Sequence, residues 1–172
     1  MIEVAYRLAS ENYRDDWYTY THASNVALLS SILATELGLD ADLAFTSGLL
    51  HDIGKMHTTQ IEHPVISYEI LAHEGYTAEA EICLFHHRFQ PDPYPLKKEL
   101  PWVTPKIYQL AALIAFCDKV EAATTRNFLR PVDAIDNAYR LCPYHDPRFG
   151  PVLLRYMNGD AGRWRYQKRS MV

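Results

Sequence analysis

The sequence has few cysteines, no excess of positive charge and no long apolar segment. Its three cysteines, Cys83, Cys117 and Cys142, are widely spaced, which argues against a disulfide scaffold and favours a reducing compartment. A net charge of −4 argues against a general nucleic-acid surface, because such a surface must neutralise phosphates. No apolar run approaches the roughly 20 residues that cross a bilayer, and the first residues lack a secretory signal. We therefore expect a cytoplasmic protein that binds neither membranes nor nucleic acid in general.

The length and composition are those of one globular domain. The chain has 172 residues, of which 48% are apolar and 22% are charged, as in ordinary soluble proteins. This length lies within the single-domain range and allows a sizeable buried core. We expect a single domain over residues 1–172. A homodimer stays open as an alternative, since apolar surface suited to pairing cannot be separated from core residues in a sequence.

Apolar residues recur at helical spacing through most of the chain, and the alternation typical of strands is missing. The predicted fold class is therefore all-α, a helical bundle. We predict helices over residues 2–11, 21–37, 40–52, from Pro64 onward, 77–87, 107–125, 131–141 and 149–157. Five of the ten prolines fall within residues 88–106, which predicts an ordered loop or lid there.

Side chains able to bind a divalent metal occur along the chain in one ordered series. A lone histidine is more often an exposed or hydrogen-bonded residue than a ligand. However, His51-Asp52, His86-His87 and Asp118 each end an apolar stretch, where a polar group is costly unless it is hydrogen-bonded or bound to a metal. Imidazole and carboxylate ligands suit iron, manganese, magnesium or zinc. We predict one shared metal centre formed by His22, His51, Asp52, His63, His86, His87 and Asp118.

The order of these residues resembles the HD superfamily of metal-dependent phosphohydrolases, in which a His-Asp doublet opens a run such as residues 51–55 (His-Asp-Ile-Gly-Lys). His63-Pro64, residues 67–71 and His86-His87 are similar to the HD-GYP branch, whose members commonly hydrolyse cyclic di-GMP. The resemblance continues through residues 115–122 and covers about residues 20–155. The Gly-Tyr-Pro loop of that branch is degenerate here, since residues 91–95 read Pro-Asp-Pro-Tyr-Pro and only the last two agree.

The resemblance implies a binuclear centre with two divalent metal ions. Iron and manganese are the metals we expect most, with magnesium, nickel or zinc as alternatives. Asp52 would be the bridging carboxylate. The first ion would be held by His22, His51 and Asp118, and the second by His63, His86 and His87. Two such cations lower the pKa of a shared water, so that hydroxide is available to attack phosphorus. A glutamate that holds a third metal in some members is replaced by Tyr18, so we expect two ions rather than three.

Further residues are candidates for catalysis and for substrate binding. Lys55 would act with Asp52 as a catalytic residue by neutralising a phosphate oxygen; the alternative is a solvated lysine in a turn. Arg126 and Arg130 would clamp a second phosphate, or else form salt bridges at helix ends. Tyr94 would stack on a base, or else hold its own loop against the domain.

Three classes of function remain open. The first is a phosphodiesterase that hydrolyses a cyclic dinucleotide or a similar diester, and this is the reading we favour. The second is a phosphomonoesterase or nucleotidase with the same metals. The third is a nucleotide-binding module that has lost turnover. In each of these classes, the expected ligand is a small phosphate ester or nucleotide.

Overall fold

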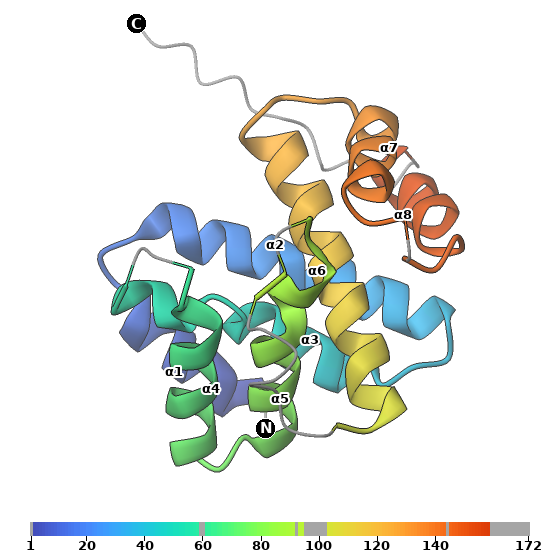
Figure 1. Ribbon diagram of the computed structural model, residues 1–172. Helices are drawn as coiled ribbons and strands as arrows, with labels where there is room; N and C mark the ends of the chain where they lie inside the picture. The colour runs from blue at the N-terminus through green and yellow to red at the C-terminus, as the bar shows by residue number, and fades with distance from the viewer. Residues whose placement is uncertain (1, 59–60, 92, 95–102, 144, 159–172) are drawn as a thin grey trace, which may run out of the picture.

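In the computed structural model, the described residues are 2–58, 61–91, 93–94, 103–143 and 145–158 (Figure 1). They form eight α-helices and two 3-10 helices, and this part of the chain contains no strand, which confirms the all-α prediction. The α-helices are α1 (Ile2–Asn12), α2 (Trp17–Glu36), α3 (Ala41–Leu50), α4 (His63–His73), α5 (Thr77–Phe85), α6 (Pro105–Thr125), α7 (Pro131–Leu141) and α8 (Phe149–Asn158). The 3-10 helices are η1 (Ile53–Met56) and η2 (His86–Phe89).

The starts of the helices follow from local sequence. The carboxylates of Asp16 and Asp40 cap α2 and α3 by accepting hydrogen bonds from the backbone N–H groups of Thr19 and Leu43, at 2.9 and 3.1 Å. Helices α4, α6 and α7 carry a proline in the first turn, where a missing N–H removes no intrahelical bond. The largest difference from the predicted bounds is at α2, which begins four residues before the predicted start at residue 21.

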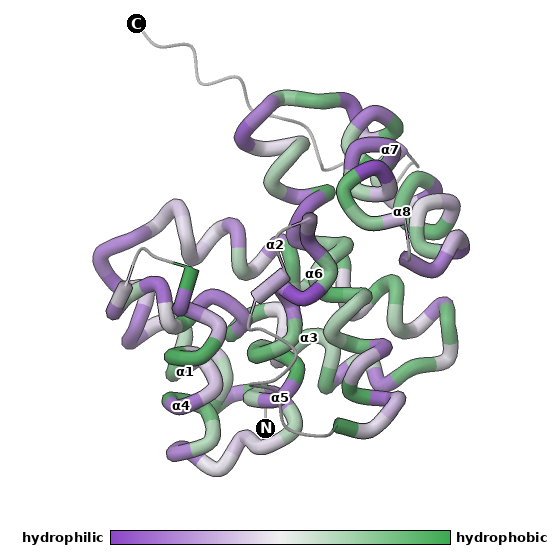
Figure 2. Tube along the Cα trace, viewed as in Figure 1, coloured by the Kyte–Doolittle hydropathy of each residue, from purple (hydrophilic) through white to green (hydrophobic). Residues whose placement is uncertain are grey.

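The two long helices α2 and α6 organise the core. One group of buried apolar residues joins α2 and α6 to α5, α7 and α8, and a second joins α2 to α1, α3 and α5. Figure 2 shows hydrophobic stretches of α3, α5 and α6 meeting in the middle of the molecule. Helices α2 and α3 cross closely at Gly48, where an added Cβ would lie 2.8 Å from the Cα of Ala27.

Helices α7 and α8 pack together and against α6 (Figure 1). Phe116 of α6 contacts Tyr139 of α7 and Phe149 of α8, with ring centroids 5.0 and 5.4 Å apart. Although α6 has 21 residues, neither it nor any other helix in the described ranges is long and apolar enough to span a bilayer.

Two helices end earlier than predicted. The prediction carried the third and fifth helices through Asp52 and His87, whereas α3 ends at Leu50 and α5 at Phe85, each followed closely by a 3-10 turn. In both cases the histidine that follows the helix donates a hydrogen bond to a backbone carbonyl of the last helical turn. The Nδ1 of His51 donates to the carbonyl of Gly48 at 2.7 Å, and His86 does the same to Cys83 at 2.5 Å. The same kind of hydrogen bond therefore fixes the orientation of both imidazoles at a helix end.

The predicted loop or lid over residues 88–106 lies partly outside the described residues. Its first two residues belong to η2, and its last two, beginning with Pro105, open α6.

Candidate metal centre

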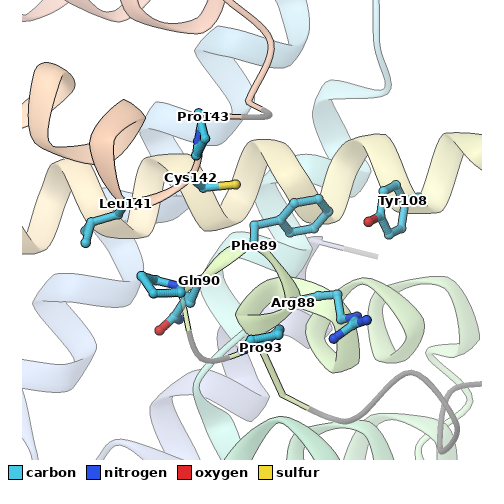
Figure 3. Close-up of a pocket in the computed structure, with 9 residues that line it drawn as sticks. Arg88, Phe89, Gln90, Pro93, Tyr108, Leu141, Cys142 and Pro143 are labelled. Atoms are coloured by element: carbon cyan, nitrogen blue, oxygen red, sulfur yellow. The ribbon is translucent and has the colours of Figure 1, made fainter.

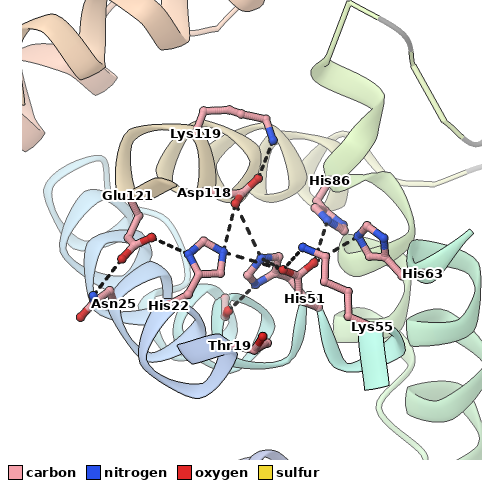
Figure 4. A network of polar contacts seen from close by, with 12 residues as sticks. Thr19, His22, Asn25, His51, Lys55, His63, His86, Asp118, Lys119 and Glu121 are labelled. Atoms are coloured by element: carbon pink, nitrogen blue, oxygen red, sulfur yellow. Dashed lines mark hydrogen bonds and ion pairs between the residues drawn. The ribbon is translucent and has the colours of Figure 1, made fainter. Parts of the chain in front are cut away.

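The structure brings all seven predicted ligand residues together from five parts of the chain. Figure 4 labels His22, His51, His63, His86 and Asp118 within this cluster. The seven residues come from α2, the corner between α3 and η1, the first turn of α4, the start of η2 and the middle of α6. Their donor atoms form three groups, and within each group all the atoms lie within 4.8 Å of one another. The groups are His22 with His51 and Asp118, His51 with Asp52 and His86, and His63 with His86 and His87.

Asp52 lies in the middle of the cluster and is 1% exposed. Its Oδ2 lies 3.2 Å from the Nε2 of His51 and 3.7 Å from that of His22. Its Oδ1 lies 3.1 Å from the Nε2 of His63 and 3.7 Å from that of His86. The two oxygens of one carboxylate therefore face two different pairs of imidazoles.

Two further residues complete the two sides of the cluster. On one side, the Oδ1 of Asp118 lies 3.2 Å from the Nε2 of His22 and 4.0 Å from that of His51. On the other side, the ring of His87 lies against those of His63 and His86, with centroids 4.5 and 4.3 Å apart.

Three of the imidazoles have a fixed acceptor behind them. The Nδ1 of His22 bonds to the Glu121 carboxylate at 2.5 Å, and those of His51 and His86 bond to backbone carbonyls. Because these acceptors take the proton on Nδ1, each Nε2 faces the centre, and in the neutral ring this atom carries the lone pair that a cation would bind. The Nε2 atoms of these three residues are buried and make no hydrogen bond within the described part of the chain. Such a set of converging lone pairs fits a divalent cation.

The protonation of the cluster also suits metal binding. Burial lowers the pKa of His86 to about 4, and burial together with the neighbouring imidazoles lowers that of His87 well below its usual value. Both rings are therefore neutral near neutral pH, which is the form that binds a metal. Burial alone would raise the pKa of Asp52, but the adjacent imidazoles, His51 first, hold it well below its usual range. The central carboxylate is consequently ionised.

His22 differs from these imidazoles. Burial would lower its pKa, but hydrogen bonds and charge from Asp118 and Glu121 outweigh it and raise the pKa to about 9. Near neutral pH and without a cation, His22 therefore holds a proton that a metal ion must displace.

The corner that carries His51 and Asp52 is fastened to the start of α4. The Ser67 hydroxyl donates to the His51 carbonyl at 3.1 Å and accepts from the Gly54 N–H at 2.9 Å. A Cβ on Gly54 would lie 2.2 Å from the carbonyl oxygen of His63. The absence of a side chain at position 54 thus allows His63 to approach the corner.

The predicted substrate residues are not all near the cluster. Lys55 donates to the Oδ2 of Asp52 and keeps 30% of its side chain exposed. The guanidinium of Arg126 lies 5.3 Å from the ring centroid of Tyr18. Arg130 is exposed and is held by Asp133 at 2.7 Å, which is the helix-end salt bridge that the sequence left open.

Tyr94, the remaining substrate candidate, is half-buried, and its predicted role in stacking is not tested by the structure. Phe89, which precedes it in the chain, packs against Tyr108 and His145 with ring centroids 4.9 and 5.8 Å apart. The rings of Phe89 and Tyr108 line a separate hollow of about 470 Å³ between η2, α6 and the end of α7 (Figure 3). The lining of this hollow includes none of the seven ligand-type residues, so it is distinct from the metal centre.

Sequence reasoning missed two residues of the cluster, Glu121 and Lys119. Glu121 is 1% exposed and accepts a hydrogen bond from the amide of Asn25 at 2.9 Å as well as from His22. Lys119 donates to the Oδ2 of Asp118 at 2.8 Å. The available signal was the presence of charged residues one and three positions after Asp118 in an otherwise apolar helix.

Comparison with known proteins agrees with the helical arrangement. The HD domain of the Listeria monocytogenes phosphodiesterase PgpH, solved in complex with cyclic-di-AMP, superposes with a TM-score of 0.66 at 20% sequence identity. The match covers 88% of this chain and 93% of that one, and a second structure of the same domain gives a TM-score of 0.62. At this identity the likeness shows the fold.

Sequence relatives match a shorter stretch. Ribonuclease Y of Thermosipho melanesiensis is 35% identical over 104 residues, and that of Fervidobacterium nodosum is 36% identical over 104 residues. Each match covers 59% of this chain and 18% of the relative, so the chain spans about a fifth of the length of these curated relatives. Membership of the HD-GYP branch within the wider family stays a prediction.

The family model described as HD domain matches residues 19–123, which is more than half of the chain. This stretch runs from the first turn of α2 into the last turns of α6. The matched stretch contains all seven candidate ligand residues. Because the family model covers more than half of the chain, the expected relationship to the HD superfamily is confirmed, and this chain belongs to the HD domain family.

Proposed function

We propose that this HD domain is a metal-dependent phosphodiesterase with a binuclear centre. The observation that carries the proposal is the position of Asp52, whose two oxygens face different imidazoles at 3.1 to 3.7 Å. A carboxylate placed in this way can bind one cation with each oxygen. A site for a single cation would need only one of these two sets of imidazoles.

The donor set divides into two halves around Asp52. His22, His51 and Asp118 would hold one cation, and His63, His86 and His87 the other. Iron and manganese remain the preferred metals, with magnesium, nickel or zinc as alternatives. When bound, such a pair of cations would lower the pKa of a bound water molecule to near neutrality. The pair would also stabilise negative charge on phosphoryl oxygens.

The protein side chains supply orientation and charge. The fixed acceptors behind His22, His51 and His86 keep the Nε2 lone pairs aimed inward, so little reorganisation is needed on binding. The ammonium of Lys55 lies next to Asp52 and is partly open to solvent. It is therefore placed to donate a hydrogen bond to a nonbridging oxygen of a bound phosphate.

The comparisons and the charge of the chain favour a small diester. The relatives are described as ribonucleases and as a phosphodiesterase bound to cyclic-di-AMP, and both descriptions concern phosphodiester bonds. The net charge of −4 disfavours binding along an extended nucleic acid. We therefore propose cyclic dinucleotides, with cyclic di-AMP and cyclic di-GMP as the first to test, ahead of RNA.

The test begins with the protein loaded with manganese or iron, followed by elemental analysis. We expect two ions per chain and faster turnover of bis(p-nitrophenyl) phosphate than of p-nitrophenyl phosphate. Cyclic dinucleotides, their linear products and a short RNA are then compared at equal concentration. Preference for the monoester would replace the proposal by a phosphomonoesterase. If nucleotide binds without turnover, the remaining function is that of a nucleotide-binding module. A single ion per chain would refute the binuclear centre.

A further inference from the structure

Two lysine ammonium groups reach the metal centre from different elements (Figure 4). Lys55 comes from η1 and bonds to Asp52, whereas Lys119 comes from α6 and bonds to the Oδ2 of Asp118 at 2.8 Å. Each contacts a buried carboxylate of the cluster, and each keeps part of its side chain exposed, 30% for Lys55 and 24% for Lys119. Both ammonium groups therefore lie between the buried cluster and solvent.

Lys119 lies beside both halves of the cluster. Its hydrogen bond goes to Asp118, which belongs to the half with His22 and His51. In Figure 4 the lysine side chain runs over Asp118 toward the side of His86.

An ordinary surface ion pair does not account for this arrangement. Helix α6 offers a comparison in Lys106, which bonds to Asp40 at 3.1 Å with both side chains largely exposed, at 58% and 40%. Such exposed pairs contribute little to stability. The partner of Lys119 is instead 9% exposed and turns its other oxygen toward the imidazoles. Lys119 is thus attached to the centre rather than to the outer surface of the helix.

The charge of the centre points to an anionic partner for Lys119. The carboxylates inside the cluster are those of Asp52, Asp118 and Glu121, and the imidazoles that bind a metal are neutral. Two divalent cations with a shared hydroxide would offset the charge of three carboxylates, so a neighbouring ammonium adds positive charge that the cluster does not balance, and the cations repel it. Lys55 adds a second such charge. A bound anion would offset this repulsion for both lysines.

We propose that Lys119 is a second phosphate-binding residue, which donates a hydrogen bond to a nonbridging oxygen of the substrate phosphate from the α6 side while Lys55 does so from the η1 side. This inference rests on the proposed function, because it takes the phosphate of the proposed diester as the ligand. Two ammonium groups on opposite elements would hold both nonbridging oxygens of one phosphate. Charge-assisted hydrogen bonds of this kind change affinity by about ten- to hundredfold.

The test compares Lys119→Met and Lys119→Arg with the parent chain and with Lys106→Met as a matched control on the same helix. Each full-length protein is loaded with manganese, and three quantities are measured: the manganese affinity, the Kd of inorganic phosphate by calorimetry, and the KM for bis(p-nitrophenyl) phosphate. For Lys119→Met we expect phosphate affinity to fall about tenfold or more and KM to rise, with manganese affinity unchanged. Lys119→Arg should restore most of the phosphate affinity, and Lys106→Met should behave as the parent.

Two results would overturn the inference. If Lys119→Met binds phosphate as tightly as the parent, the lysine does not contact the ligand. If Lys119→Met loses manganese in proportion to phosphate, Lys119 only positions Asp118. Failure of the proposed function would look different, since the parent itself would then hold no manganese or hydrolyse no diester. A parent that holds manganese but binds no phosphate would also refute the role of Lys119.

Discussion

The Nδ1 of His22 hydrogen-bonds to the Oε2 of Glu121 at 2.5 Å, although the two residues lie 99 positions apart in the chain. Glu121 is held in turn by Asn25 on its Oε1 and by Thr125 on its Oε2. Every carboxylate oxygen therefore has a donor, and the group is almost fully buried. The contact fixes the orientation of His22 and ties α2 to α6 at the metal centre.

We expect Glu121→Gln to weaken the binding of the first metal ion. An amide of the same size offers only one acceptor oxygen, so it cannot accept from both Asn25 and His22. The amide nitrogen would face the Nδ1–H of His22 and favour the wrong tautomer. Loss of such a carboxylate partner behind a metal-binding histidine commonly lowers affinity about 10- to 100-fold. Competition titration with a metal chelator measures this directly.

The matched control for that variant is Glu36→Gln. Glu36 lies on the same helix as His22 and bonds to Arg155 and Tyr156 on the surface. Its substitution should leave metal affinity unchanged. If Glu121→Gln also binds manganese like the parent while the helical circular dichroism is preserved, the positioning role of Glu121 is wrong.

Asp52→Ala should abolish the binding of both metal ions and the hydrolysis of bis(p-nitrophenyl) phosphate. The reason is that the two oxygens of Asp52 face imidazoles of both halves. The helical fold should persist, because the core lies in separate apolar groups between the helices. Elemental analysis and circular dichroism test this, with the exposed Asp133→Ala as control. Retention of two ions in Asp52→Ala would contradict the bridging role.

The sequence was sufficient to single out most of the candidate ligand residues, because His51-Asp52, His86-His87 and Asp118 each end an apolar stretch. A histidine after residues 43–50 or 82–85 is expensive to bury without a partner, and this signal is local. The order of the ligands along the chain then added the family resemblance. Their spatial grouping follows once α2, α3, α5 and α6 pack by their apolar faces.

The surroundings of the ligands were not predictable in the same way. Glu121 resembles any solvated glutamate in a helix until α2 packs against it, so its role depends on a residue 99 positions away. The ends of α3 and α5 were placed too late, because the periodicity of apolar residues does not show that the imidazoles of His51 and His86 bond to the carbonyls three residues earlier. For Arg130 the prediction of substrate binding missed a local contact. Asp133, three residues later in the chain, accepts a hydrogen bond from the guanidinium that we had predicted to bind a phosphate.

Metal affinity should rise with pH from about 7 to about 9 by roughly tenfold per unit, because metal and proton compete for the same imidazole. The sign follows from His22, whose pKa is raised to about 9 and which therefore holds a proton below that pH. His86 has a pKa of about 4 and releases no proton in this range. Calorimetry in buffers of different ionisation enthalpy should show about one proton released as the first ion binds. An affinity independent of pH over this window would show that His22 is already neutral.

Gly54→Ala should disturb the centre without touching a ligand side chain. The new methyl group would lie 2.2 Å from the His63 carbonyl oxygen and 2.8 Å from the Ser67 backbone nitrogen, and neither is a flexible side-chain end. The corner and the start of α4 must therefore separate. We expect a loss of about 1–3 kcal/mol in the free energy of unfolding, together with weaker binding of the second ion through His63.

Gly38→Ala separates this steric effect from backbone strain. Gly38 has φ +68 and nothing within 4 Å of an added Cβ, so alanine there meets only the left-handed penalty of about 1–2 kcal/mol. Urea unfolding of the metal-free proteins compares the two losses, and chelator titration compares the metal affinities. Both variants should be less stable than the parent, but only Gly54→Ala should lose metal affinity, because only position 54 lies between the His51-Asp52 corner and His63. Equal metal affinity in the two variants would mean that α4 can shift at Gly54 without moving His63 from the cluster.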